Sequence, residues 1–227
     1  MKTSNKILLS GFLVVILAAI TLMVIFRLNL NKARKAYEQL QDTQIRELES
    51  FRSINGKGNL TIKWSQGNTQ KIKIEGHKDD IEKISTTVKE DTLYVTLRSP
   101  LKQKTRTRIH ITSDSINEII LTDTCELDMD TKAVFDKLAI DLSSHSELEL
   151  HGEANSARIF CSSKSHLDAE GLIIRNCYIE TESEATAEIK ASKKLNILAK
   201  SNSKVYYSGK PENININTET GGGVEED

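Results

Sequence analysis

The stretch LAIDLSSHSELEL, residues 138–150, decides the fold of this chain of 227 residues. Its apolar residues occupy alternate positions at Leu138, Ile140 and Leu142, and the alternation resumes at Leu148 after a polar segment. Alternation with a period of two predicts β-strands that bury one face. The polar segment SSHSE between the strands predicts a tight turn. One structural unit is therefore a strand, a turn and a second strand.

The same unit recurs through the second half of the chain at intervals of 18 to 21 residues. One position is isoleucine in all six copies: Ile119, Ile140, Ile159, Ile179, Ile197 and Ile216. Six places further on, every copy has a small residue: Cys125, Ser146, Ser165, Ala185, Ser203 and Gly222. A fixed period near twenty residues is typical of stacked supersecondary units. It predicts an all-β solenoid with the isoleucines stacked inside, about 4.8 Å apart, and a column of small residues that lets successive turns approach closely.

The composition excludes several classes of function. The formal net charge is −1 and no basic stripe is present, which argues against nucleic acid as a partner. The cysteines, Cys125, Cys161 and Cys177, form neither a CxxC motif nor a Cys/His pattern with zinc-site spacing. We expect them to be small apolar core residues, and we expect no cofactor.

Residues 7–26, ILLSGFLVVILAAITLMVIF, carry no charge. At about 1.5 Å rise per residue, a helix of this length matches the roughly 30 Å hydrocarbon core of a bilayer. Arg27 follows the segment directly, and no small-residue cleavage site ends it. We therefore expect residues 1–6 to form a short tail and residues 7–26 an uncleaved transmembrane signal anchor, with the lipid bilayer as its partner.

The charges that flank this segment bear on its orientation. Lys2 and Lys6 precede it, whereas four basic residues follow it: Arg27, Lys32, Arg34 and Lys35. The positive-inside rule would then place the repeat domain in the cytoplasm. The bias is modest, so the charges alone leave the topology open.

Residues 27–55 connect the apolar segment to the repeat domain. From Asn31 to Arg52 the chain lacks Gly and Pro and is rich in helix formers. Its apolar residues recur at spacings of three to five: Tyr37, Leu40, Ile45, Leu48 and Phe51. The pattern predicts a helical stalk, which either leans on the solenoid or forms a short coiled coil that makes a weak homo-oligomer.

Residues 56–227 form the expected solenoid domain, and its first part lacks the fixed period. Alternating apolar segments such as Leu60-x-Ile62-x-Trp64 predict half-buried strands between residues 59 and 112. We expect an entry region of hairpins that covers the open apolar end of the stack. The loop of residues 99–108 carries four positive charges, and it is either a solvated loop or a contact for an acidic partner or lipid headgroup.

Residues 54–224 resemble the head GIN domain family, described as heads of putative auto-transporter adhesins. The resemblance rests on the entry hairpins, the phrase DSINEI at residues 114–119, the serine-rich turns and the phrase VYYSGKP at residues 205–211. Family members usually carry Gly-Ser-Gly in the turns, where this chain has SSHS at residues 143–146. The resemblance implies a right-handed β-solenoid (β-helix or β-roll), with no catalytic residues to carry over. It also implies, against the charge count, a periplasmic domain on a single-pass inner-membrane anchor.

No catalytic constellation is visible in the sequence. The outward pairs Asp128/Asp130 and Glu147/Glu149 would suit calcium binding or acid–base chemistry. Strands with alternate polar residues produce such pairs automatically, because residues i and i+2 share a face. Glu147 and His166 share an offset in the repeat, and no nucleophile elbow, phosphate-binding loop or dinucleotide motif is present. We expect no catalytic, cofactor-binding or metal-binding residues.

Three functional hypotheses follow from these patterns. The first is a membrane-anchored extracytoplasmic solenoid, not an enzyme, that binds a glycan or an envelope protein in the manner of an adhesin. The second is a cytoplasmic, membrane-tethered scaffold that polymerises end to end, like bactofilins. The third is a carbohydrate-active enzyme on a β-helix. We expect the first.

Overall fold

The computed structural model describes residues 12, 16–17, 19–32, 41–102 and 107–227. The chain divides into two compact units, residues 1–41 and 42–227. In the first unit, residues 19–32 are helical. No helix among the described residues is both long and apolar enough to cross a membrane. Much of the anchor expected at residues 7–26 lies outside the described residues, namely residues 7–11, 13–15 and 18.

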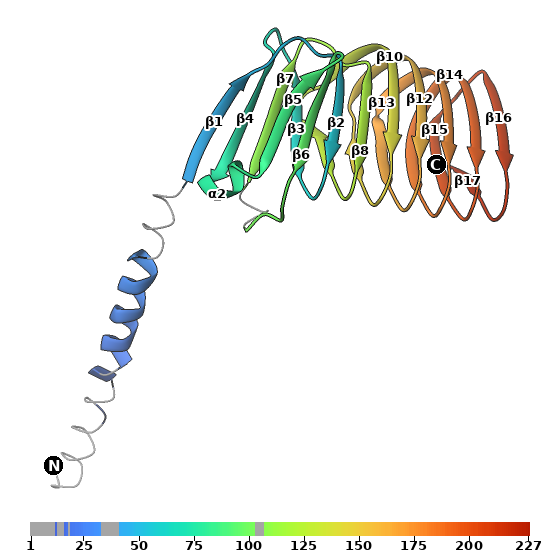
Figure 1. The fold of residues 1–227 in the computed structure, drawn as a ribbon. Helices are drawn as coiled ribbons and strands as arrows, with labels where there is room; N and C mark the ends of the chain where they lie inside the picture. The colour runs from blue at the N-terminus through green and yellow to red at the C-terminus, as the bar shows by residue number, and fades with distance from the viewer. Residues whose placement is uncertain (1–11, 13–15, 18, 33–40, 103–106) are drawn as a thin grey trace. The chain divides into compact units, whose positions relative to one another are not determined.

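The second unit is a β-solenoid built mainly from two parallel stacks of strands, which confirms the all-β solenoid (Figure 1). The first stack contains, in spatial order, β6 (Thr92–Leu97), β2 (Ser53–Lys57), β8 (Glu118–Thr122), the C-terminal parts of β10 (Ala133–Leu142), β12 (Gly152–Cys161), β13 (His166–Thr181) and β14 (Thr186–Ala199), and β16 (Asn213–Thr218). The second contains β7 (Arg108–Ser113), β3 (Thr61–Gln66), β9 (Glu126–Met129), β11 (Glu147–Glu149), the N-terminal parts of β13 and β14, β15 (Lys204–Gly209) and β17 (Gly223–Glu226).

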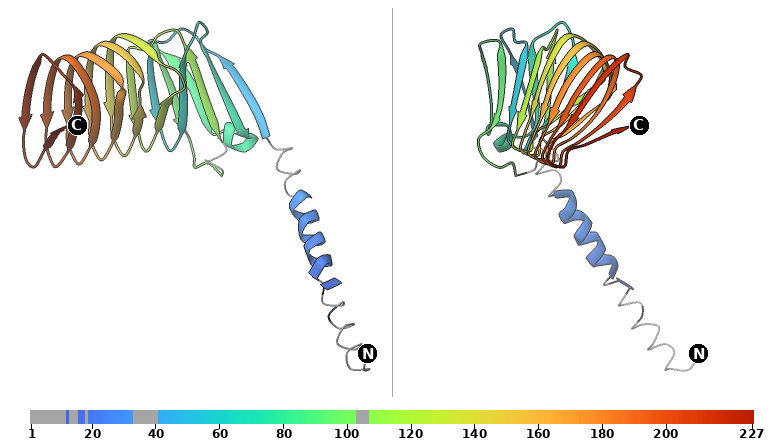
Figure 2. Two further views of the ribbon diagram at one scale, coloured as in Figure 1. Left: turned by 180° about the vertical axis from the view of Figure 1, so that it is seen from behind. Right: turned by 90° about the vertical axis from the view of Figure 1, so that its right-hand side faces the viewer.

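The long strands bend as they pass from one side of a coil to the next. In β10 the alternation of buried and exposed residues is interrupted at Asp136 and Lys137, which are both exposed. Two consecutive outward residues mark a corner, because a straight strand would send one of them inward. The rungs follow one another along the stack in both views of Figure 2.

The isoleucines that mark the repeat lie directly opposite one another in the parallel ladder. Five of them, from Ile119 to Ile197, are at most 3% exposed. Ile216 differs from the expected inward stacking because it is 44% exposed. It belongs to β16, the last strand of its stack, so that only one neighbouring coil packs against its side chain.

Each coil turns through two consecutive residues with positive φ, as at Ser144 (φ 58) and His145 (φ 63). The turn closes with a hydrogen bond from the Ser146 N–H to the Ser143 carbonyl, at 3.3 Å. This is the conformation of a type I′ turn, which favours Asn-Gly. The six turns instead use Asp123-Thr124, Ser144-His145, Ser163-Lys164, Ser183-Glu184, Ser201-Asn202 and Thr220-Gly221. Most of these left-handed positions therefore carry a side chain that strains the backbone.

The small residues of the repeat come directly after these turns and point inward. Cys125, Ser146, Ser165, Ala185 and Ser203 are at most 1% exposed. At Gly222 an added Cβ would lie 2.1 Å from the carbonyl oxygen of Ala199. Two of the serine hydroxyls donate to a backbone carbonyl of the neighbouring coil: Ser165 to Leu142 at 3.2 Å and Ser203 to Thr181 at 2.9 Å. Close approach of successive coils accounts for the small side chains.

The entry region covers the first coil with antiparallel strands. β4 (Lys71–His77) runs antiparallel to β7, and β5 (Ile84–Lys89) runs antiparallel to β6. The helical turn α2 (Lys78–Ile81) joins β4 to β5. β2 lies between β6 and β8, so the first coil in space comes later in the chain than the second. Of the entry hairpins expected from the sequence, the described residues form one, β5–β6, whereas β4 pairs with the non-consecutive β7. The spatial order of the entry strands is therefore not the order of the chain.

The helical stalk expected over residues 27–55 is only partly helical. Helix is present up to residue 32, and residues 33–40 lie outside the described part. β1 (Gln41–Glu47) is a strand that pairs with β4. The Arg46 guanidinium donates to the carbonyl of Ile84 at 3.0 Å and to the hydroxyl of Thr86 at 2.7 Å. These tertiary contacts outweigh the helix propensity of the segment, and the stalk prediction is wrong for residues 41–47.

Alanine at Ile179 and at Ile216 should have very different effects on stability. Ile179 is fully buried, so Ile179→Ala should lower the free energy of unfolding by about 2–5 kcal/mol through lost burial and a cavity. Ile216→Ala should cost less than about 1 kcal/mol because this side chain is already half exposed. Urea unfolding followed by circular dichroism measures both, and equal losses would contradict the placement of β16 as the last rung.

Glycine at a left-handed turn position should stabilise the protein. Lys164 has φ 63, and Lys164→Gly removes backbone strain of about 1–2 kcal/mol against about 0.5–1 kcal/mol of added chain entropy. The exposed Lys164–Glu184 ion pair, at 3.5 Å, contributes little. We expect a higher melting temperature for Lys164→Gly. The matched control is Lys194→Gly within β14, which should lower the melting temperature. A lower melting temperature in both variants would contradict the strain at Lys164.

Candidate functional site

The outward side chains of the second stack form an acidic column. Glu149 lies opposite Asp168, and Asp168 lies opposite Glu188 in the next coil. One coil earlier, burial and the nearby Glu149 carboxylate raise the pKa of Asp128, against the opposing charge of Lys63. The acidic pairs identified in the sequence therefore belong to a longer ladder. In the adjacent column Glu147 lies opposite His166.

Three carboxylates of this face come close together. The oxygens of Asp168, Glu170 and Glu188 lie within 4.8 Å of one another. Asp168 also accepts a hydrogen bond from the Glu170 N–H at 3.2 Å, a local contact of the kind that Asp side chains make in turns. This contact does not require a metal ion. Exposed carboxylates stack in this way wherever acidic residues recur at one offset of a solenoid, so we assign no metal here.

A shallow depression of about 660 Å³ lies on the outer face where β3, β7 and β4 adjoin. Most of its lining residues are basic or carry a hydroxyl: Lys63, Ser65, Lys71, Lys73, Glu75, Arg108, His110 and Thr112. Glu75 is the one acidic residue in this set. We call this set the basic depression.

The strand register explains why these side chains converge. His110 of β7 lies opposite Lys63 of β3 on one side and opposite Lys73 of β4 on the other. Thr112 lies opposite Ser65 and Lys71 in the same way. The basic depression therefore consists of cross-strand rows on three neighbouring strands, all on one face because residues i and i+2 share it.

The charges in the basic depression are only partly neutralised. The Lys73 ammonium lies 2.7 Å from a Glu75 oxygen, and the Lys63 ammonium lies 3.4 Å from Asp130. The hydrogen bond from Lys73 is the main cause that lowers the pKa of Glu75. Lys71 and Arg108 have no carboxylate within 4 Å in the part of the chain that the structure describes.

This site is not predicted from the sequence. Of the described residues of the basic loop at 99–108, Arg108 alone lines the depression. The available signal was basic residues at alternate positions of two separate strands, Lys71-x-Lys73 and Arg108-x-His110. Nothing in the sequence says that these strands pair.

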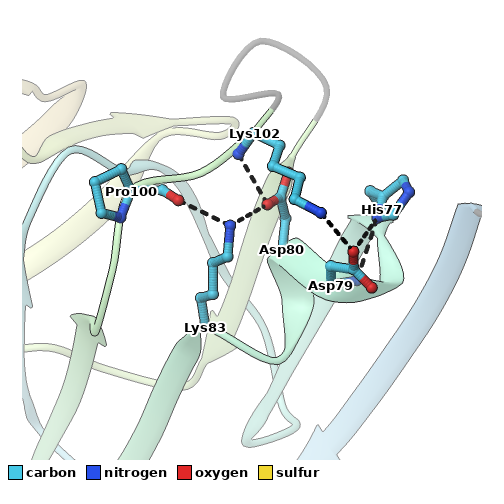
Figure 3. Close-up of polar contacts among 6 residues, drawn as sticks. All are labelled: His77, Asp79, Asp80, Lys83, Pro100 and Lys102. Atoms are coloured by element: carbon cyan, nitrogen blue, oxygen red, sulfur yellow. Dashed lines mark hydrogen bonds and ion pairs between the residues drawn. The ribbon is translucent and has the colours of Figure 1, made fainter.

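The described part of the basic loop is held by contacts within the domain (Figure 3). The Lys102 ammonium donates to Asp79 at 2.8 Å, and its backbone N–H donates to Asp80 at 2.9 Å. The Lys83 ammonium joins the same Asp80 carboxylate at 2.9 Å and the Pro100 carbonyl at 2.8 Å. Because Asp80 is fully buried, this network fixes the loop to α2. Lys104 and Arg106 lie outside the described residues.

The cysteines are buried core residues. Cys125, Cys161 and Cys177 lie in the core and are at most 2% exposed. Burial raises the pKa of the Cys177 thiol to about 12, and burial likewise raises that of Cys161, with a further contribution from Asp141. A thiol with a raised pKa stays protonated at neutral pH and is a poor nucleophile or metal ligand.

Two histidines on the surface contact carboxylates. His151 Nε2 lies 2.9 Å from Glu149, and the His110 ring nitrogens lie 3.9 Å from Glu75 and 3.7 Å from Asp130. A nucleophile activated by histidine would need a hydroxyl or thiol within hydrogen-bonding reach of the ring. These contacts give ion pairs when the rings are protonated.

Solved structures from Bacteroides and Parabacteroides species share the fold. A putative adhesin from Bacteroides fragilis is 18% identical with a TM-score of 0.64, and the match covers 82% of this chain and 96% of that chain. A putative adhesin from Parabacteroides merdae is 14% identical with a TM-score of 0.53, covering 82% and 96%. A putative lipid binding protein from Parabacteroides distasonis is 14% identical with a TM-score of 0.50, again covering 82% and 96%. At these identities the similarity shows the fold alone.

Comparison with curated proteins finds no match. The model of the family described as "Putative auto-transporter adhesin, head GIN domain" matches residues 50–211. That range holds the entry strands, the basic depression and most of the coils. It also includes the phrases DSINEI at residues 114–119 and VYYSGKP at residues 205–211. The chain therefore belongs to the head GIN domain family.

Proposed function

We propose that this protein is a membrane-anchored, extracytoplasmic binding module with no catalytic activity. The family is described as an adhesin head, and two of the similar structures are named putative adhesins. An adhesin head acts outside the cytoplasm and needs an attachment to the cell. The uncharged segment of residues 7–26 is long enough to supply that attachment as a single-pass inner-membrane anchor, with the solenoid in the periplasm.

One observation carries the binding role. Outward side chains of successive coils lie in register, so that one chemical type repeats at the spacing of the rungs, as from Glu149 through Asp168 to Glu188. Such a face is rigid because each strand is hydrogen-bonded on both sides within the stack. Rigid, repeating faces suit extended partners such as glycans or the exposed strands of envelope proteins.

The arrangement of the ends argues against a polymerising scaffold. Antiparallel β4 and β5 flank the first coil, so this end does not offer a parallel strand of the kind that continues the stack. An open filament needs head and tail surfaces that complement one another. The two ends of this solenoid differ in strand direction, which favours a single binding module over a subunit of a filament.

The surface chemistry favours binding over catalysis. The acidic pairs that would serve a glycan-cleaving enzyme are part of a column produced by the repeat. The buried Cys161 and Cys177 thiols are protonated at neutral pH, and His110 and His151 face carboxylates. One solved structure with the same fold is named a putative lipid binding protein, which makes a lipid headgroup a candidate ligand, and the basic depression is where such a headgroup would fit.

The topology is tested by fusing a reporter after Asp227. Alkaline phosphatase folds to an active form only outside the cytoplasm, so this fusion should be active, and a fluorescent protein that fails to mature after export should be dark. Deleting residues 7–26 should reverse both signals, because the anchor is also the export signal. An inactive phosphatase with a bright fluorescent fusion in the full chain would refute the extracytoplasmic placement.

A further inference from the structure

We infer that the basic depression on β3, β7 and β4 is a binding site for a phosphate group. The inference deepens the proposed binding function, because it gives the chemical class of one ligand. It does not depend on the side of the membrane on which the domain lies. The residues that carry it are Lys63, Lys71, Lys73, Arg108 and His110, together with the hydroxyls of Ser65 and Thr112.

The first reason is the concentration of positive charge in cross-strand rows. Lys63 and Lys73 flank His110 from the two neighbouring strands, at directly opposed positions. Opposed side chains on neighbouring strands have Cβ atoms about 4.5–5.5 Å apart. Each of the two lysines has one carboxylate partner, Asp130 for Lys63 and Glu75 for Lys73. The rows still hold more cations than carboxylates, so a bound anion would gain favourable charge interactions there.

The second reason is the balance of charge in the basic depression. Four lining residues are Lys or Arg, and Glu75 is the one lining carboxylate. Glu75 already accepts a hydrogen bond from Lys73 at 2.7 Å. Lys71 and Arg108 are exposed, and no carboxylate lies within 4 Å of either among the described residues. Glu75 lies opposite Arg108 and interacts with it at longer range, whereas Lys71 lies opposite Thr112. Lys71 is therefore the more available of the two cations to an incoming ligand.

The donors fit phosphate better than a single carboxylate. A phosphate monoester offers three non-bridging oxygens and a phosphodiester two, set tetrahedrally, and Lys ammonium groups, hydroxyls and an Arg fork can bind them together. Lys71 lies opposite Thr112, and Lys73 and His110 form the next row on the same face. Arg108 lies four residues from Thr112 along β7, about 13 Å at the backbone, so only its extended side chain can approach the same group. A carboxylate presents two oxygens in one plane and would leave more of these donors unused.

The site is also held in place from beneath. The inward residues of the same three strands, including Trp64, Ile72 and Ile111, are fully buried. The Trp64 indole N–H donates to the Ser113 hydroxyl at 2.8 Å, which ties β3 to β7. Donors mounted on paired strands over a packed core lose little freedom when a ligand binds.

The test uses the full chain in neutral-detergent micelles and isothermal titration calorimetry. The probes are inorganic phosphate, dihexanoyl-phosphatidylglycerol and dihexanoyl-phosphatidylcholine. We expect phosphatidylglycerol or inorganic phosphate to bind with an affinity that falls as salt rises, and phosphatidylcholine to bind much more weakly, because its headgroup has no net charge. Binding of both anions assigns a phosphate group from a soluble ester or a lipid, and binding of phosphatidylglycerol alone assigns the lipid headgroup.

Variants locate the binding. Lys71→Gln/Arg108→Gln should weaken it roughly tenfold or more, the effect of losing a hydrogen bond to a charged group. The matched control Arg175→Gln/Lys193→Gln removes the same charges from exposed positions elsewhere and should bind like the unaltered chain. Glu75→Gln removes the acidic lining residue and should tighten binding, which a damaged fold would not do.

Three results would overturn the inference. The first is that neither inorganic phosphate nor phosphatidylglycerol binds. The second is that phosphatidylcholine binds as tightly as phosphatidylglycerol. The third is that the site variant and the control variant lose the same amount of affinity. A cytoplasmic domain in the reporter experiment would refute the proposed placement while leaving phosphate binding intact. An absence of phosphate binding together with an active phosphatase reporter would refute the phosphate site while leaving the extracytoplasmic placement intact.

Discussion

The in-register backbone ladder, continued through the turns, is the constraint on which the rest of this solenoid depends. The His145 N–H donates to the carbonyl of Ser163 at 3.1 Å, and the Lys164 N–H donates to that of Ser183 at 3.0 Å. A turn that left the left-handed conformation would lose its bonds to the coils on both sides. Each bond contributes roughly 0.5–1.5 kcal/mol, which offsets the strain at a side-chain-bearing left-handed position. The ladder explains why five of the six turns keep this conformation without glycine.

Because the ladder fixes where each side chain points, the core can change only by substitution within a column. Two places after the isoleucine, the inward residue is leucine in the first two coils and smaller in the next three: Leu121, Leu142, Cys161, Thr181 and Ala199. Thr181 is a polar member of this buried column, and its hydroxyl lies 2.8 Å from that of Ser203. A polar side chain is accepted inside because its partner comes from the column of small residues.

The sequence predicts those parts of the fold that repeat, because a recurring offset is equivalent to a register. It does not predict the strand order of the entry region, where β2 lies between two strands that follow it in the chain. It also misassigns residues 41–47, since Gln, Arg and Glu favour helix locally while pairing with β4 is a tertiary effect. The basic depression is not predicted for the same reason, because Lys63, Lys73 and His110 are brought together only by pairing between strands that are distant in the chain.

The position of the basic depression follows from the change in strand direction at the entry of the solenoid. Along the parallel coils, one offset of the repeat meets the same offset of the next coil, so columns of like side chains form a flat face. At β4 the direction reverses, and residues with no equivalent in the repeat face β7. Donors of different kinds can then surround one small group. The repeating coils present long uniform surfaces to an extended partner, whereas the entry strands provide the irregular surface that recognition of a compact ligand requires.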